Sequence, residues 1–296
     1  MTLAPIALFT YNRLAHTQQT VEALQKNEFA AQSDLYVFSD GPKAAADEPE
    51  VEAVRNYLEG VDGFKSRAIK RQTSNLGLAR SIVAGVTEIC QRHGRVIVVE
   101  DDLVTAPCFL RYMNEALALY ENDSEVISIH GYVFPVQATL PETFFLKCAS
   151  CWGWATWQRG WNEFNADVRS LLTEIETRKL TTEFDFNDTY SYTEMLRQQI
   201  TRPTDSWAIR WYASAFLKNK LTLYPGRSLV QNIGHDSSGV HCGQSATFDV
   251  CLAERPVTVE RLPLSENPLA RRAFENFFRS LRRPSFLQKL RRRLFK

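Results

Sequence analysis

The first hundred residues alternate short apolar runs with longer amphipathic stretches. The apolar runs occupy 5–9, 35–39, 67–71 and 96–99, and the helical stretches between them cover 14–27, 47–60 and 77–92. This alternation predicts an α/β fold with a Rossmann-like, mostly parallel central sheet flanked by helices. Such sheets bind their ligands beyond the carboxyl ends of the strands. Candidate functional residues are therefore those that follow each apolar run.

Polar or glycine-containing segments follow all four apolar runs. They read TYNR at 10–13, SDGPK at 39–43, TSNLG at 73–77 and EDD at 100–102. Because parallel strands end at the same edge of a sheet, we expect these segments to line a single crevice.

The most unusual of these segments is the acidic triplet, which is Glu100, Asp101 and Asp102. Adjacent carboxylates repel one another unless a cation or several hydrogen bonds hold them in the charged form. Mg²⁺ and Mn²⁺ prefer oxygen ligands and commonly share them with substrate phosphates. The alternative is an exposed acidic turn before a helix, where negative charge is also favourable.

Three further strand ends carry candidate nucleotide ligands. Asp40 could accept the imide N–H of uracil, and Arg13 could reach a base or a phosphate; the alternative for Asp40 is an ordinary Asp-Gly-Pro turn. Asn75 and Arg80, in NLGLAR, are expected to pass near the same ligand.

All six tryptophans lie between residues 152 and 211. Aromatic faces can stack against the apolar faces of sugar rings, but an equally common outcome is a packed aromatic core. Asp205 lies among these aromatics, just before a helix expected to begin near Trp207. It could act as a general base toward a hydroxyl group or simply cap that helix.

A strand near Leu221 is followed by a loop rich in glycine, serine and histidine, a composition typical of a segment that closes over a ligand. His235 and His241, in this loop, could bind phosphate or be exposed. The cysteines at 148 and 151 lack a second ligand pair at zinc spacing, so a structural zinc is not expected.

The chain carries a strong charge asymmetry. Residues 271–296 contain ten Lys or Arg and one Glu, a net charge of +9, so the rest of the chain carries −8. Phenylalanine and leucine recur at helical spacing in this segment, which predicts either a helix at an anionic membrane surface or a helix packed on its own domain. Nucleic acid is not expected, because the body is acidic. The apolar runs are too short to span a bilayer, and no basic segment opens the chain. We therefore expect a cytoplasmic protein with reduced cysteines, peripheral at the inner face of the cytoplasmic membrane.

In motif order, the chain resembles a bacterial glycosyltransferase of the glycosyltransferase A fold, similar to the N-acetylglucosaminyltransferase I family. The resemblance is carried by Asn12-Arg13, by Asp40 in SDGP, by VVEDDL, by CWGW at 151–154, by TDSW and by GVHCG at 239–243. It implies that Asp102 binds manganese or magnesium, that Glu100 and Asp101 serve the donor sugar and ribose, and that Asp205 is the catalytic base. It also implies donor contacts by Val240 and His241 and acceptor or sugar contacts by Trp152, Gly153, Trp154 and Trp207.

These observations predict a metal-dependent, inverting glycosyltransferase. Its donor would be a nucleotide diphosphate sugar such as UDP-GlcNAc, and its acceptor a glycan or lipid-linked saccharide of cell-surface polysaccharide or lipopolysaccharide synthesis. We expect a nucleotide-sugar half at 1–105, an acceptor half at 106–265 and a basic amphipathic tail at 266–296. Two alternatives remain: a sugar-phosphate nucleotidyltransferase, although TYNRLAHT lacks a glycine-rich phosphate loop, and a non-catalytic, membrane-associated carbohydrate-binding protein.

Overall fold

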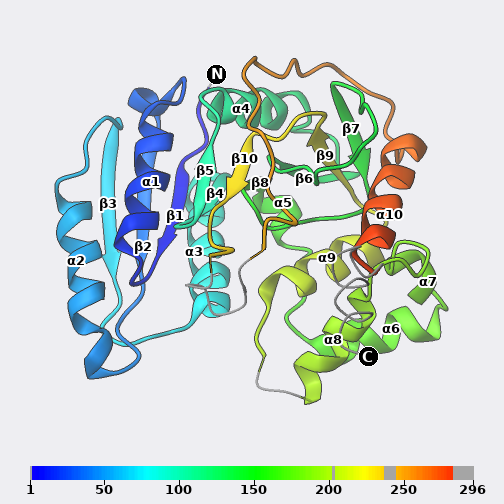
Figure 1. Ribbon diagram of the computed structural model, residues 1–296, viewed down its shortest axis with the longest axis horizontal. Helices are drawn as coiled ribbons and strands as arrows, with labels where there is room; N and C mark the ends of the chain where they lie inside the picture. Colours follow the sequence, from blue (N-terminus) through cyan, green and yellow to red (C-terminus); the bar gives the residue numbers. More distant parts are fainter. Residues whose placement is uncertain (1, 202–203, 237–244, 283–296) are drawn as a thin grey trace, which may run out of the picture.

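The computed structural model describes residues 2–201, 204–236 and 245–282. An eight-stranded sheet lies at its centre, in the order β3-β2-β1-β4-β8-β6-β9-β7 (Figure 1). The strands of this sheet are β1 (Ile6–Thr10), β2 (Asp34–Ser39), β3 (Ser66–Arg71), β4 (Arg95–Glu100), β6 (Val126–His130), β7 (Thr143–Leu146), β8 (Trp154–Trp157) and β9 (Leu221–Pro225). The helices are α1 (Leu14–Gln25), α2 (Glu48–Glu59), α3 (Leu78–His93), α4 (Phe109–Leu119), α5 (Gln158–Trp161), α6 (Val168–Thr177), α7 (Thr181–Phe184), α8 (Tyr192–Thr201), α9 (Trp207–Leu217) and α10 (Pro268–Arg282).

The sheet is mostly parallel. Strands β1 to β4 pair in parallel, and β6 and β9 run in the same direction because β6 and β4 are both antiparallel to β8. Of the strands described in this sheet, β8 and β7 run the opposite way. The predicted α/β class and its mostly parallel central sheet are therefore confirmed, and the first four predicted strands appear within one residue of their expected bounds.

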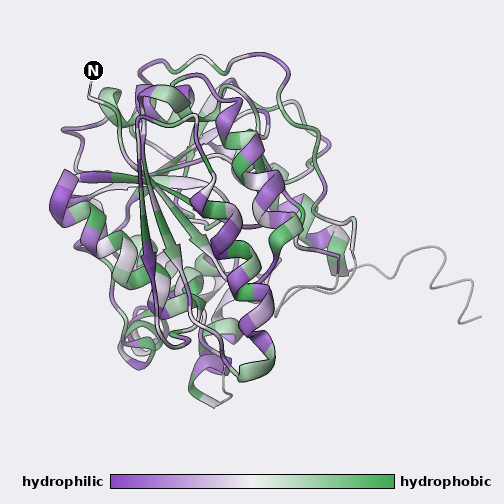
Figure 2. Cartoon of the chain, turned by 90° about the vertical axis from the view of Figure 1, so that its left-hand side faces the viewer, coloured by the Kyte–Doolittle hydropathy of each residue, from purple (hydrophilic) through white to green (hydrophobic). Residues whose placement is uncertain are grey.

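Helices cover both faces of the sheet, as Figure 2 shows with the sheet seen nearly edge-on. On β1, Ile6 and Leu8 join the core that contains α1, α2 and α4, whereas Ala7 and Phe9 pack against α3. Successive side chains of a strand point to opposite faces, so a strand buried on both faces is apolar throughout. This is why the strands could be recognised as continuous apolar runs.

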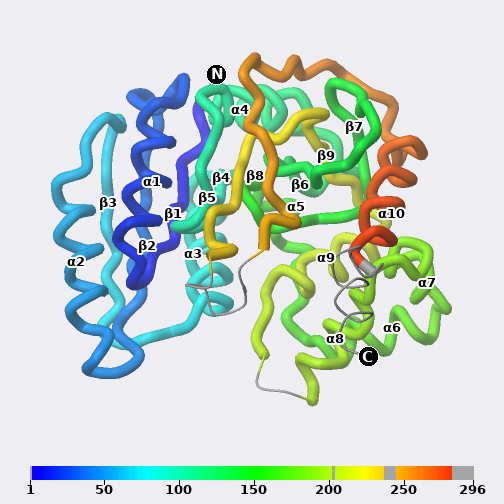
Figure 3. The backbone as a smooth tube through the Cα atoms, in the orientation of Figure 1, coloured from blue at the N-terminus to red at the C-terminus, as the bar shows by residue number. Residues whose placement is uncertain are grey.

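A second, two-stranded sheet brings a distant segment to the end of β4. Strand β5 (Leu103–Thr105) follows the acidic triplet directly and pairs antiparallel with β10 (Val230–Asn232). Figure 3 traces the yellow β10 segment alongside β5. The backbone N–H of Ile233 also donates to the carbonyl of Asp102 over 2.8 Å, so this ribbon ends at the acidic triplet.

One sheet carries both predicted halves of the molecule, because β4 of the first half pairs directly with β8 of the second. The division into donor and acceptor halves at residue 105 is a functional one, and it stays a prediction.

The C-terminal helix α10 belongs to the core of the second half. Ala270, Phe274 and Phe278 are buried in a hydrophobic cluster with β7, β9 and helices α6 to α9. Of the two outcomes left open by the sequence, a helix packed on its own domain therefore applies to α10, whose apolar face is covered by the protein itself. Amphipathic periodicity is the same whether the apolar face meets a membrane or a protein core. The remainder of the predicted tail, 283–296, lies outside the described residues.

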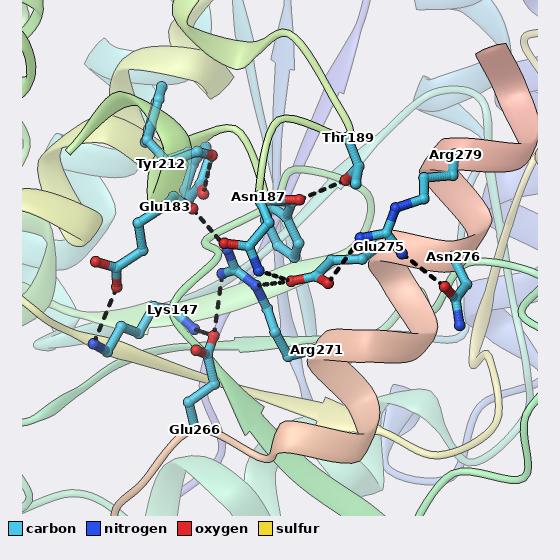
Figure 4. Close-up of polar contacts among 12 residues, drawn as sticks. Lys147, Glu183, Asn187, Thr189, Tyr212, Glu266, Arg271, Glu275, Asn276 and Arg279 are labelled. Carbon is cyan, nitrogen blue, oxygen red and sulfur yellow. Dashed lines mark hydrogen bonds and ion pairs between the residues drawn. The ribbon is translucent and has the colours of Figure 1, made fainter.

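Charged side chains on the inner face of α10 are paired with the second half (Figure 4). Arg271 Nε donates to Glu275 Oε1 over 3.1 Å, and its Nη2 donates to the carbonyl of Glu183 over 2.6 Å. Asn187 Nδ2 donates to the same Glu275 oxygen over 2.6 Å, and the guanidinium carbon of Arg271 lies 3.9 Å from the centroid of the Phe186 ring. Phe186 and Asn187 have φ values of 51° and 53°. These contacts hold a turn that is uncommon for residues other than glycine.

Replacing Glu275 by alanine should destabilise the protein. The Arg271 and Glu275 side chains are only 10% and 9% exposed, and removing one partner of a buried pair costs about 3 kcal/mol because the other charge is left uncompensated. Urea unfolding of Glu275→Ala measures the loss. Arg272→Ala, an exposed position on the same helix, is the control and should change the free energy of unfolding by less than about 0.5 kcal/mol. Equal effects of the two variants would contradict this role for the pair.

Candidate active site

The site predicted from the strand ends is assembled at one edge of the sheet. Arg13 follows β1, Asp40 follows β2 and the acidic triplet begins at the end of β4. Strand β8 runs antiparallel and begins at the same edge, where Trp154 pairs with Val98. The residues that precede Trp154 in the chain therefore lie beside the acidic triplet.

Arg13 is the counter-ion of the acidic triplet. Its Nη2 lies 2.5 Å from Asp101 Oδ1 and 2.9 Å from Asp102 Oδ2. Asp101 Oδ2 also accepts the backbone N–H of Tyr11 over 3.3 Å. Sequence reasoning expected Arg13 to contact the nucleotide, but it did not anticipate that Arg13 bridges two carboxylates. Asn12 lies between these residues and is partly exposed at the same edge.

One arginine does not neutralise three carboxylates. Burial, followed by the charges of Asp102 and Asp101, raises the pKa of Glu100 well above its usual value. Burial also raises the pKa of Asp101, although Arg13 opposes that shift. Burial and then the Glu100 and Asp102 carboxylates also raise the pKa of the Cys151 thiol. A second cation near Glu100 and Asp102 would relieve this repulsion.

The donor set suits a metal that is shared with a substrate. Within the described ranges, no group of three or more His, Cys, Asp or Glu side chains is arranged to hold a metal ion. Mg²⁺ and Mn²⁺ do not require such a cage, since one or two carboxylates together with substrate phosphates and water commonly suffice. The side chain of Asp102 is 15% exposed and that of Asp101 is 7% exposed. Asp102 is therefore the more accessible of these two carboxylates.

Gly234 is a site residue that sequence reasoning missed. A Cβ atom on it would meet Asp102 Oδ2 and lie 3.1 Å from Arg13 Nη1, so any side chain here would collide with the acidic site. The backbone N–H of Gly234 donates to Asn232 Oδ1 over 2.8 Å, and His16 Nε2 lies 3.1 Å from Asp236 Oδ2. The glycine-rich composition of this loop was noted in the sequence, but its contact with Asp102 depends on the pairing of β5 with β10. Val240 and His241 lie outside the described residues.

Asp40 holds the loop that precedes α3. Its Oδ1 accepts the backbone N–H groups of Gly41 and Leu76, and its Oδ2 accepts those of Gly77 and of the Asn75 side-chain amide, at 2.8–3.1 Å. A carboxylate oxygen has two lone pairs, so all four are used. In this arrangement Asp40 and Asn75 organise the loop, and Asp40 has no lone pair left for the predicted contact with uracil.

The tryptophans differ in burial, because Trp152 is partly exposed and the other five are buried in the core. Trp154 and Trp207 are 0% and 3% exposed, and their rings stack at a centroid distance of 5.3 Å. They share one hydrophobic cluster with Trp161 and Trp211, so of the two outcomes left open by the sequence, a packed core applies to them. The prediction that Trp154 and Trp207 contact sugar is corrected accordingly.

Trp152 remains a candidate ligand contact, because it is partly exposed. Its ring centroid lies 4.7 Å from that of Tyr132 and 5.3 Å from that of His235. Gly153 follows with a φ of 66°, and its carbonyl accepts the N–H of Gly131 over 2.7 Å, which sets the backbone at the start of β8.

Asp205 is exposed and does not cap α9. The N-cap is Ser206, whose side chain makes no capping hydrogen bond. Asp205 Oδ1 accepts from Arg210 Nη2 over 2.6 Å, and the Asp205 side chain is 56% exposed. Asp205 lines a cleft of about 630 Å³ together with Arg80, so the structure brings these two predicted site residues together.

Comparisons with known proteins give no family for this chain. No family model and no curated protein matches it. Among solved structures, it is similar to the mannosyltransferase PcManGT from Pyrobaculum calidifontis in complex with GDP-Man and Mn²⁺ (14% identity, TM-score 0.34, covering 44% of this chain and 35% of that one). It is also similar to TarS from S. aureus (13% identity, TM-score 0.43, covering 79% of this chain and 37% of that one). A further similar structure is a UDP-glucose pyrophosphorylase complexed with UDP-glucose (13% identity, TM-score 0.37, covering 75% of this chain and 90% of that one). The chain spans less than two thirds of the length of the first two. At these scores the likenesses carry no functional argument.

Among the described helices there is no candidate membrane span. In the part of the chain that the structure describes, none is both long enough and apolar enough to cross a bilayer.

Proposed function

We propose that this protein is a metal-dependent glycosyltransferase that moves a sugar from a nucleotide diphosphate donor, such as UDP-GlcNAc, to a hydroxyl group of a glycan. The observation that supports this most directly is the acidic triplet at the end of β4, where two carboxylates share a single arginine. A parallel sheet that ends in such a cluster presents oxygen ligands at the edge where nucleotides bind.

Each residue at this edge of the sheet would have a separate role in binding the metal and the donor. Asp102 would hold the divalent cation, which when bound neutralises the charge that develops on a departing diphosphate. Arg13, now paired with Asp101 and Asp102, would face the phosphates. Glu100 would contact a hydroxyl group of the donor sugar, and Asp101 would accept a hydrogen bond from the ribose.

Asp205 would accept the proton of the acceptor hydroxyl as that oxygen attacks the anomeric carbon. Direct attack of this kind inverts the configuration at that carbon. The exposed carboxylate of Asp205 and the partly exposed ring of Trp152 support an acceptor that enters from the side of α9 and β8.

Isothermal titration with UDP tests the proposal. With Mn²⁺ present, UDP should bind at least about tenfold more tightly than with EDTA, a difference of about 1.4 kcal/mol. Absent or metal-independent UDP binding would overturn the proposal. Release of pyrophosphate from UTP and a sugar 1-phosphate would instead favour the nucleotidyltransferase alternative.

We also propose peripheral contact with an anionic membrane through residues 283–296, which contain six Lys or Arg and no Asp or Glu. Each basic residue near such a surface contributes about 1 kcal/mol. Because α10 is part of the core, the informative variant ends at Arg282 and removes only 283–296. Co-sedimentation with phosphatidylglycerol vesicles should be lost in this variant at low salt, and undiminished binding would refute the contact.

A further inference from the structure

The cleft beside α3 has no residue of the acidic triplet among its lining residues, and it has a chemistry of its own. It has a volume of about 630 Å³ and is bounded by α3, by residue 166 and by the start of α9. That volume lies within the range of small-molecule sites, roughly 300–1,000 Å³. Ala84 and Ala166 contribute only methyl groups to the lining, which leaves room for a ligand.

The charges around this cleft do not balance. Arg210 is paired with Asp205 at 2.6 Å, and Glu88 is paired with Lys70 at 2.5 Å. Arg80 is exposed and makes no hydrogen bond or ion pair with any other described residue. Arg210 also has a buried Nε with no hydrogen-bond partner among the described atoms. Among the described residues, the cleft therefore offers one unpaired positive charge, that of Arg80.

The cationic and the uncharged residues of the cleft lining lie at different positions along α3. Arg80 lies in the first turn of α3, whereas Ala84 and Glu88 follow one and two turns later on the same face. A ligand with a single anionic group could pair with Arg80 while its uncharged body lies along α3. Asp205 borders the same space, so a hydroxyl group of that ligand could reach its carboxylate.

We propose that this cleft binds the acceptor, and that the acceptor is a saccharide carrying an anionic group, either a carboxylate or a phosphate, that pairs with Arg80. The assignment of the ligand as acceptor rests on the proposed function, whereas the binding of an anionic saccharide does not. Under this proposal Arg80 contacts the acceptor, whereas the sequence pattern predicted that it contacts the donor.

Ligand-detected NMR tests the binding with three probes: glucose, glucuronic acid and glucose 6-phosphate. At least one anionic probe should bind more tightly than glucose, by up to about fivefold, since an exposed ion pair contributes up to about 1 kcal/mol. Arg80→Gln should erase this preference. Arg92→Gln, an exposed position on α3 outside the cleft lining, is the matched control and should retain it. If neither anion is preferred over glucose, or if both variants behave alike, the proposal is overturned.

A second variant and a second measurement separate this inference from the proposed function. Ala84→Phe, at an exposed position, should fill the cleft and weaken all three probes while the protein stays folded by circular dichroism. UDP binding with Mn²⁺ should be unchanged in Ala84→Phe and Arg80→Gln. If Arg80→Gln weakens UDP and leaves the saccharide preference intact, Arg80 serves the donor and the inference fails. If wild-type protein binds no UDP but keeps the Arg80-dependent preference, the transferase proposal fails and the anionic saccharide site stands.

Discussion

Asp102→Asn should abolish the Mn²⁺ dependence of UDP binding and weaken UDP binding in the presence of Mn²⁺ by about two orders of magnitude. An amide oxygen is a poorer ligand than a carboxylate for a hard divalent cation. The substitution preserves the shape of the side chain and an oxygen that can accept from Arg13, which donates to Asp102 over 2.9 Å. The fold should therefore be retained, and removing one negative charge lowers the repulsion on Glu100.

Asp101→Asn is the matched comparison for this variant. Asp101 is the neighbouring carboxylate, is less exposed and is held by both Arg13 and the N–H of Tyr11. We expect it to weaken UDP binding while leaving the ratio of affinities with and without Mn²⁺ unchanged. Isothermal titration measures both affinities, and electron paramagnetic resonance of Mn²⁺ reports the metal directly. If Asp102→Asn keeps its metal dependence and Asp101→Asn loses it, the metal ligand is Asp101.

Asp205→Asn should lower the transfer rate by about 10²–10⁴-fold, the usual contribution of a general base. Its carboxylate is 56% exposed, so the free energy of unfolding should change by less than about 0.5 kcal/mol. UDP binding with Mn²⁺ should be unaffected, because Asp205 is assigned to the acceptor. The rate is measured as UDP released from the donor with a saccharide acceptor selected from a panel.

Losing the surface ion pair between Asp205 and Arg210 would not by itself lower the transfer rate to this extent. Glu194→Gln is the control, since Glu194 is exposed and paired with Arg197 at 3.8 Å on α8. It should leave transfer at the wild-type rate. Full turnover by Asp205→Asn would remove Asp205 from the role of base and leave its ion pair with Arg210 as a structural contact.

Much of the fold was predictable because it depends on local patterns. The apolar runs at 5–9 and 96–99 became β1 and β4, and their parallel pairing placed TYNR next to EDD. The same local patterns left two outcomes open where two environments produce the same periodicity. For α10, the apolar face that suits either a membrane or a protein core is covered by β7, β9 and the helices of the second half.

The candidate site was predictable in position and less so in contacts. Glu100, Asp101 and Asp102 lie where the strand end predicted, but the pairing of Arg13 with two of them was not visible in the sequence. The roles of Asp40 and Trp154 also depended on their neighbours, because one carboxylate is saturated by a loop and one indole is buried. Residue type and spacing do not report how many partners a side chain has.

The sequence by itself determined the α/β class, the edge of the sheet at which polar residues collect and the acidic triplet at that edge. Each of these depends on residues close together in the chain, whose periodicity and order are visible directly. The tertiary structure alone decided which aromatics are buried, that Gly234 lies against Asp102, and that Arg80 shares a cleft with Asp205. These contacts join segments far apart in the chain, and they exist only because strand pairing and packing of the whole sheet bring those segments together.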